Sequence, residues 1–225
     1  MIICVILQAA KIVQQPTEVQ EAALPLVIWL IIGAFALLAG IIYATKTEPV
    51  KGTTMAVLGM QASGKTQFYK TLQNIEYTGY EATSVNDYDG FDIKLPDRTI
   101  HICKGTDIGG TEAYIKQYYK KMICDNEIVV FIFDVYKYLN DSGYSRNTNA
   151  RFDFINLHRN EKSIVILGSH LDNFPESKRK NIIEQVQQRN NGKVYAELFS
   201  VNFFTLDMRS KEAVQKVAEK IFKNK

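Results

Sequence analysis

One stretch of this sequence sets the architecture around it: Met55-Ala56-Val57-Leu58-Gly59-Met60-Gln61-Ala62-Ser63-Gly64-Lys65-Thr66-Gln67. Residues 59–66 have the spacing Gly-x-x-x-x-Gly-Lys-Thr, and the apolar run before them predicts a strand. The residues after them, 68–72, can continue a helix. A glycine turn with this spacing between a strand and a helix is typical of a phosphate-binding loop. The alternative is a turn that binds nothing, which the presence of all three fixed residue types disfavours.

The residue types of this stretch suit a nucleotide together with Mg²⁺. Gly59 and Gly64 let the backbone turn tightly, so that successive N–H groups and the start of the helix face a phosphate. Lys65 is expected to reach the β- and γ-phosphate oxygens, and the Thr66 hydroxyl to coordinate a bridging Mg²⁺. The expected nucleotide-binding positions here are Gly59, Ala62, Ser63, Gly64, Lys65, Thr66 and Gln67.

Composition limits the class of protein. With 225 residues, 46% of them apolar, the chain can bury one substantial core, and we expect one domain with an appendage. The formal charge is only +3 and the basic residues are dispersed, so no nucleic-acid partner is expected. Three scattered cysteines are too few for a disulfide framework or a zinc site, and reduced thiols in a cytosolic domain are predicted.

The N-terminal part predicts a membrane span. Residues 22–45 carry no charge, and about 20 helical residues at roughly 1.5 Å each cross a hydrocarbon layer of about 30 Å. Trp29 and Tyr43 lie toward opposite ends, where aromatic rings favour the headgroup boundary. A cleaved signal peptide would be shorter and nearer the N-terminus, and a buried core helix rarely lacks polar side chains over this length. We therefore expect an N-terminal segment 1–21, a transmembrane helix 22–45 and a linker 46–51.

The remaining residues, 52–225, are predicted to form one domain in the cytosol. Lys46 and Lys51 follow the span, whereas only Lys11 precedes it closely. A nucleotide site with Mg²⁺ favours the same orientation, because both ligands are abundant in the cytosol.

The domain has the pattern of an α/β fold with six mostly parallel strands and helices between them. The continuous apolar runs 128–133 and 163–167 are typical of strands that are covered on both faces. Residues 91–95 alternate like an edge strand, and Pro96-Asp97-Arg98 turns them into a hairpin. The expected strands are 55–58, 91–95, 99–104, 128–133, 163–167 and 201–206. The expected helices are 65–74, 112–124, part of 152–158, 175–188 and 211–222. The polar stretch 140–149 is expected to be a loop.

Two further stretches are candidates for the nucleotide site. Asp107-Ile108-Gly109-Gly110 follows the second hairpin strand, at the end where open α/β sheets bind ligands. We expect Asp107 to hold Mg²⁺ through water and the Gly110 N–H to contact a γ-phosphate, with an ordinary Asp-Gly turn as the alternative. Residues 77–90 have no strand or helix pattern. Thr83 in this stretch is expected to complete the Mg²⁺ shell only when the γ-phosphate is bound, against the alternative of an ordinary loop threonine.

These stretches resemble Arf-type small GTPases. The resemblance covers residues 52–225 and depends on the loop 59–66, Thr83, Asp107 to Gly110 and Tyr118-Tyr119. The preceding span makes the chain similar to one branch of that family, the membrane-anchored β subunits of the signal-recognition-particle receptor. The resemblance implies a protein that binds GTP, GDP and Mg²⁺ and recruits a soluble protein through its switch loops. It also implies a location in the endoplasmic reticulum membrane, with the C-terminal domain in the cytosol.

The base-recognition motif departs from the family. Where the family has Asn/Thr-Lys-x-Asp, this chain has Ser169-His170-Leu171-Asp172. The resemblance implies that Asp172 binds the base, whereas Ser169 and His170 stand in place of the partners that brace this loop and stack on the base. A carboxylate that accepts two N–H groups fits guanine but not adenine. The family's Ser-Ala-Lys loop has no match near Thr205-Leu206-Asp207.

The position that orients the attacking water also differs from the family. Thr111 stands where the family has a water-orienting Gln, and a threonine is too short to hold the attacking water there. We therefore expect slow unaided hydrolysis, assign no catalytic residue, and expect any arginine finger to come from a partner.

Two alternative functions stay open. A scaffold with permanently bound GTP is favoured by Thr111. A P-loop kinase or ATPase is favoured by Ser169-His170, and its lid arginine would be one of Arg146, Arg151 and Arg159.

Overall fold

The computed structural model describes residues 52–76, 85–109, 118–160, 162 and 164–223. The chain divides into two units after Val50, and the description concerns the second unit. In the described ranges no helix is long and apolar enough to cross a membrane. The predicted span at 22–45 lies outside these ranges.

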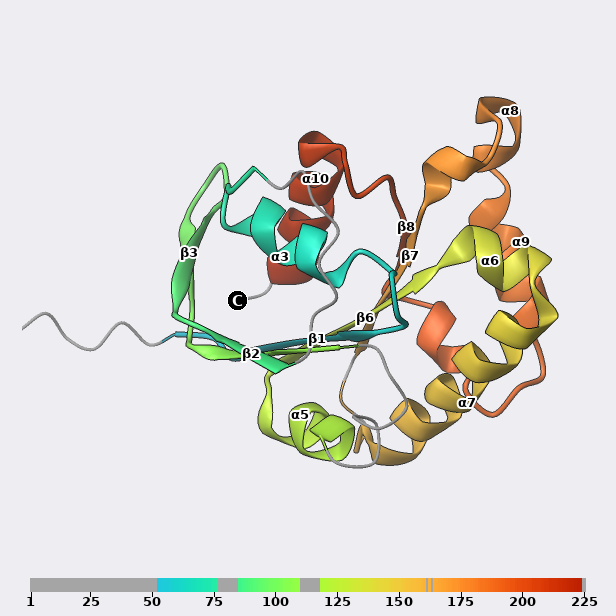
Figure 1. Ribbon diagram of the computed structural model, residues 1–225, viewed down its shortest axis with the longest axis horizontal. Coiled ribbons are helices and arrows are strands. Elements are labelled where there is room, and N and C mark those ends of the chain that lie inside the picture. The colour runs from blue at the N-terminus through green and yellow to red at the C-terminus, as the bar shows by residue number, and fades with distance from the viewer. Residues whose placement is uncertain (1–51, 77–84, 110–117, 161, 163, 224–225) are drawn as a thin grey trace, which may run out of the picture. The chain divides into compact units, whose positions relative to one another are not determined.

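A four-stranded parallel sheet forms the centre of the domain (Figure 1). Its strands, in spatial order, are β1 Met55–Gly59, β6 Ile128–Asp134, β7 Ile164–Ser169 and β8 Phe203–Thr205. Every residue of β1, β6 and β7 is buried, as strands with helices on both faces require. The domain is therefore α/β, and the four apolar runs predicted as strands are confirmed.

An antiparallel hairpin lies beside this sheet. Strand β3, Phe91–Lys94, pairs with β4, Thr99–Ile102, and β2, Val85–Tyr88, pairs with β5, Gly105–Ile108. A parallel bridge between Thr53 and Ile102 joins the hairpin to the chain just before β1. No strand was expected within 77–90, and this prediction is wrong for the part that forms β2. Asp107 was expected in a loop after the hairpin and instead lies within β5. Short, mostly polar strands carry too little apolar periodicity to be recognised.

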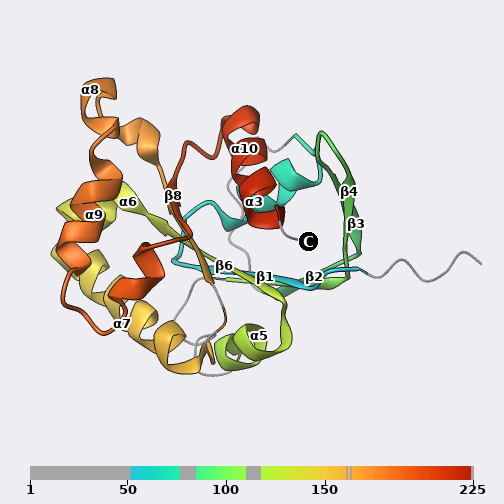
Figure 2. The same ribbon diagram turned by 180° about the vertical axis from the view of Figure 1, so that it is seen from behind.

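Helices cover both faces of the sheet (Figures 1 and 2). Helices α3 and α10 pack on one face, and α5, α6, α7 and α9 pack on the other. The helices are α3 Lys65–Leu72, α5 Lys120–Asp125, α6 Val135–Asn140, α7 Ser142–His158, α8 Glu176–Arg179, α9 Ile182–Asn190 and α10 Lys211–Phe222, with 3-10 turns η2 Leu171–Asn173 and η3 Ala196–Phe199. Helix α10 has the predicted bounds. The predicted helix 175–188 is two helices, and of the predicted helix 112–124 the described part contains α5.

The loop predicted at 140–149 is wrong, because most of it is the first half of α7. Asp141 caps that helix: its Oδ1 accepts hydrogen bonds from the N–H groups of Gly143 at 2.8 Å and Tyr144 at 3.0 Å. The Tyr144 hydroxyl in turn accepts from the Asp134 N–H at 2.8 Å. Ser145 and Thr148 are buried although they are polar, which hides the inward face of this helix from a hydrophobicity pattern.

Candidate functional site

The central feature of the site is the lysine loop, residues 59–66, which connects β1 to α3. It leaves the sheet at the carboxyl end of β1. The strands β6, β7 and β8 run parallel to β1, so their carboxyl ends lie along the same edge. Open α/β sheets bind their ligands at this edge.

The backbone of the loop needs glycine at both ends. A Cβ on Gly59 would lie 2.2 Å from the carbonyl oxygen of Ile132 on the neighbouring strand. Gly64 has a φ of +89°, and a Cβ there would lie 3.2 Å from the Met208 Cγ. Ala62, with a φ of +55°, is also in the left-handed region. The chain therefore turns back tightly between the strand and the helix.

Polar groups of the loop converge on its inside. Lys65 is 6% exposed, and its Nζ donates to the Met60 carbonyl oxygen at 2.9 Å. The Oγ of Ser63 is buried and has no hydrogen-bond partner among the described residues. The first hydrogen bond of α3 runs from the Phe68 N–H to the Gly64 oxygen at 2.9 Å. The helix itself therefore uses none of the N–H groups of 65–67, and its positive end adds to the lysine charge. This is a place that favours an anion.

Thr66 and Gln67 are half-buried in the first turn of α3. The Gln67 side chain donates to the Thr71 Oγ1 at 3.2 Å. The Thr66 hydroxyl is a hard oxygen donor of the kind that Mg²⁺ prefers. Among the described residues no group of three or more His, Cys, Asp or Glu side chains can hold a metal ion. Mg²⁺ is commonly held by one or two protein oxygens together with phosphate oxygens, so Thr66 fits that mode of binding.

Two buried side chains contact the lysine loop from the α7 side of the sheet. Tyr119, directly before α5, shares two hydrogen bonds with the backbone of Gly59. Arg151, on α7, donates to the Gly59 carbonyl oxygen at 3.1 Å. Both residues are mentioned in the sequence analysis, but not for this contact. Tyr119 is part of the family resemblance, and Arg151 is a candidate lid arginine.

The end of β7 carries the first part of the predicted base site. Ser169 is fully buried, and its Oγ donates to the Phe133 carbonyl oxygen at 3.0 Å and lies 2.9 Å from the His170 Nδ1. The His170 Nδ1 also lies 3.7 Å from the buried carboxylate of Asp134. Ser169 thus ties the ends of β6 and β7 together, and His170, with a φ of +59°, redirects the chain into η2.

The second part of the predicted base site is an ion pair. Asp172 is 19% exposed, and its Oδ2 accepts from Arg209 at 2.9 Å. Arg209 also binds the Asp207 carboxylate, at 3.0 and 3.1 Å. Partial burial opposes ionisation of Asp207, but the hydrogen bonds and charge of Arg209 outweigh it and lower the pKa of this carboxyl. Arg209 is not recognisable as a site residue from the sequence, because a lone arginine after a strand has no distinctive pattern.

The segment 206–209 connects the two regions. Leu206 donates its N–H to the Gly168 oxygen at 2.9 Å, which fixes the segment beside β7. Met208 is the side chain nearest to Gly64 in the lysine loop, and the next residue, Arg209, contacts Asp172. The lysine loop and Asp172 therefore lie at the same edge of the sheet.

Several predicted site residues are not placed here. Thr83, Gly110 and Thr111 lie outside the described residues. The backbone of Asp107 is paired with Asn86 in the hairpin. No protein-family model and no curated protein sequence matches this chain. The functional argument therefore depends on the residues and their geometry.

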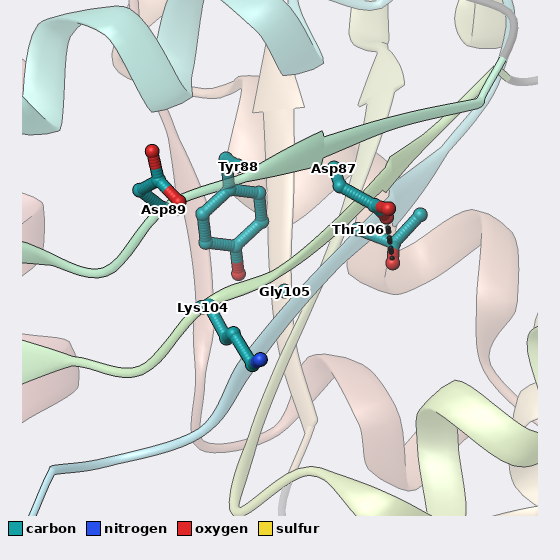
Figure 3. A pocket seen from close by; sticks show the side chains of 6 residues that line it. All are labelled: Asp87, Tyr88, Asp89, Lys104, Gly105 and Thr106. Carbon is teal, nitrogen blue, oxygen red and sulfur yellow. Dashed lines mark hydrogen bonds between the residues drawn. The ribbon is translucent and has the colours of Figure 1, made fainter.

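A separate pocket of about 340 Å³ lies on the hairpin (Figure 3). Its lining residues are Asp87, Tyr88, Asp89, Lys104, Gly105 and Thr106. The Thr106 Oγ1 donates to the Asp87 Oδ1 at 2.8 Å, and the Tyr88 hydroxyl donates to the Met55 oxygen at 2.9 Å. None of the predicted nucleotide-binding residues lines this pocket.

Proposed function

We propose that this chain is a membrane-anchored GTP-binding protein of the small-GTPase type. In this proposal it binds one guanine nucleotide with Mg²⁺, hydrolyses GTP slowly without help, and recruits a soluble protein in one nucleotide state. The observation that carries the proposal is the lysine loop, with its left-handed Gly64 and buried Lys65, at the same sheet edge as Asp172.

The fold proposed for this function is a three-layer domain with six mostly parallel strands. The bridge from Thr53 to Ile102 and the packing of β5 against β1 support it. In this arrangement the hairpin extends the four-stranded sheet beyond β1. Asp107 on β5, one of the residues predicted to sense the γ-phosphate, would then lie near the lysine loop.

Each part of the loop has a chemical role in the proposal. The N–H groups at the start of α3 donate to phosphate oxygens, and Lys65 exchanges its bond to the Met60 oxygen for bonds to those oxygens. Bound Mg²⁺ would neutralise phosphate charge, with Thr66 as the described ligand and Thr83 as the ligand predicted from the sequence. Ser63, which is buried without a described partner, supplies a further hydroxyl.

Guanine recognition is proposed for Asp172. Its carboxylate can accept the two neighbouring N–H groups of guanine, and adenine offers no such pair. In the structure one guanidinium nitrogen of Arg209 lies 2.9 Å from an oxygen of this carboxylate. Guanine carries the same arrangement of N–H donors, so the base and Arg209 would compete for Asp172.

Anchoring and hydrolysis follow from the sequence. The span 22–45 is proposed to hold the domain at the cytosolic side of a membrane, the endoplasmic reticulum if the receptor resemblance applies. Thr111, in place of a water-orienting Gln, is the reason to propose slow hydrolysis. The same residue favours the second candidate, a scaffold that keeps GTP bound. Single-turnover hydrolysis with and without cell extract separates the two, because stimulated cleavage is expected only for the switch.

Two of the three candidate lid arginines of the kinase or ATPase alternative are engaged in other contacts. Arg151 is buried under the lysine loop, and Arg159 is paired with Glu197 at the far end of α7. Arg146 remains, exposed on α7. A lid needs an arginine that can reach the phosphates, and the two engaged side chains would first have to leave their partners.

The proposal is tested by competition binding on the full chain, purified in detergent. Labelled GTP should be displaced by unlabelled GTP far better than by ATP, and displacement by both at similar concentrations would contradict guanine recognition.

Lys65→Ala should abolish binding without unfolding the domain. Lys70→Ala, which removes a lysine from the same helix but not from the loop, is the control and should bind like the wild type.

A further inference from the structure

The contacts beneath the lysine loop form one closed hydrogen-bond network. The Tyr119 hydroxyl accepts from the Gly59 N–H at 3.2 Å and donates to the Gly59 carbonyl oxygen at 3.0 Å. The Arg151 Nη1 donates to that same carbonyl oxygen at 3.1 Å and to the Tyr119 oxygen at 3.2 Å. A tyrosine hydroxyl has one donor and two acceptor positions, and all three are used here.

The network is buried, and the Tyr119 hydroxyl in it is protonated. Tyr119 is 1% exposed and Arg151 is 4% exposed. Burial raises the pKa of the Tyr119 phenol, an effect that the Arg151 charge only partly offsets, so the hydroxyl keeps its proton and donates to Gly59. The Arg151 guanidinium carbon lies 5.8 Å from the centre of the Tyr119 ring, which holds the two side chains together.

The network contacts Gly59, where the lysine loop begins, so it acts on the loop as well as on the core. Met60 donates its N–H to Ile132 on β6, so the N–H and C=O of Gly59 point to the opposite side of β1. Tyr119 and Arg151 satisfy both groups there. Gly59 is the last residue of β1 and the first of the lysine loop, so the orientation of its peptide groups fixes the direction in which the loop leaves the sheet.

We propose that Tyr119 and Arg151 are positioning residues that set the conformation of the lysine loop and thereby its affinity for the phosphates of a nucleotide. The proposal rests on the function proposed above. It assigns a role to a buried tyrosine and a buried arginine through their contacts with the backbone of Gly59. Because they act on the phosphate end of the site, their loss weakens GTP and GDP equally and leaves the preference for guanine over adenine unchanged.

A matched pair of variants separates positioning from stability. Tyr119→Phe removes the hydroxyl of the network. Tyr138→Phe removes another buried hydroxyl, which contacts Asn149 at 2.9 Å and Asn190 at 2.8 Å and has no contact with the lysine loop. Both should lower the unfolding midpoint of the full chain. Only Tyr119→Phe should weaken GTP and GDP binding, by about tenfold, which corresponds to the loss of roughly one buried hydrogen bond. Arg151→Lys, which keeps the charge but not the planar fork, should weaken binding by a similar factor.

A second readout does not depend on nucleotide. Amide hydrogen exchange of Gly59, measured on the ligand-free full chain in detergent, should accelerate in Tyr119→Phe and not in Tyr138→Phe. If the wild type binds nucleotide and the two variants have equal affinities, or if Gly59 exchange is unchanged, the positioning role is wrong and the proposed function stands. If the wild type binds no nucleotide, both proposals fail.

Discussion

Replacing Gly59 with alanine tests the close approach of β1 and β6 at the start of the lysine loop. The added Cβ would lie 2.2 Å from the Ile132 carbonyl oxygen, 3.0 Å from its carbon and 3.1 Å from its nitrogen. All three are backbone atoms, so relief requires the two strands to separate. Overpacking of a rigid site costs about 1–3 kcal/mol and sometimes more. We expect Gly59→Ala to lie at the upper end, with a loss of about 3 kcal/mol in the free energy of unfolding.

Gly192→Ala is the matched control. Gly192 also has a positive φ, +74°, but nothing lies within 4 Å of a Cβ placed there. Only the cost of the left-handed conformation remains, about 1 kcal/mol. Urea denaturation followed by circular dichroism measures both variants. If Gly59→Ala is no less stable than Gly192→Ala, the pairing of Gly59 with Ile132 is wrong, and with it the geometry given for the loop.

Three further predictions concern other parts of the domain. Arg209→Gln frees the Asp172 carboxylate, so the affinity for GDP in a calorimetric titration should rise, by no more than a few-fold because exposed ion pairs are weak; a fall would mean that Arg209 helps to hold the base. Asp141→Ala removes the N-cap of α7 and should lower the free energy of unfolding by about 1 kcal/mol in urea, whereas an unchanged value would contradict the start of that helix. Stability should fall as the pH rises above 10, because burial raises the pKa of Tyr195 to about 12, so between these values the phenol ionises in the unfolded chain only. Tyr195→Phe should make that fall shallower in pH-dependent denaturation, and an identical pH profile would rule out this contribution.

The apolar parts of the fold were predictable from the sequence. The runs that became β6 and β7 are buried along their whole length, so hydrophobicity alone identifies them. Helix α10 was predicted with its bounds because its inward residues, Val214, Val217 and Ala218, recur at helical spacing. Where burial and hydrophobicity agree, the pattern is sufficient.

The polar parts were not predictable for the opposite reason. The first half of α7 buries Ser145 and Thr148, and its cap, Asp141, is recognisable only when the helix is known to begin there. The strands β2 and β5 are held by backbone pairing and by contacts such as that between Thr106 and Asp87, which leave no apolar alternation. Pairing between distant segments decides these elements.

The site divides in the same way. The lysine loop was identified because its residues are consecutive, so their spacing carries the geometry. Arg209, Tyr119 and Arg151 act through contacts with residues distant in the sequence, and only the fold brings them to Asp172 and Gly59. The sequence makes Arg151 a candidate lid residue, whereas in the structure its side chain is buried and donates to Gly59.

Calorimetric titration of the full chain with GTP in magnesium buffer tests the central claim most directly. Binding of one GTP per chain is expected, with no heat of binding for the Lys65→Ala variant at the same concentrations. If the folded wild-type protein gives no heat with any guanine or adenine nucleotide, the lysine loop does not bind nucleotide and the proposed function is wrong.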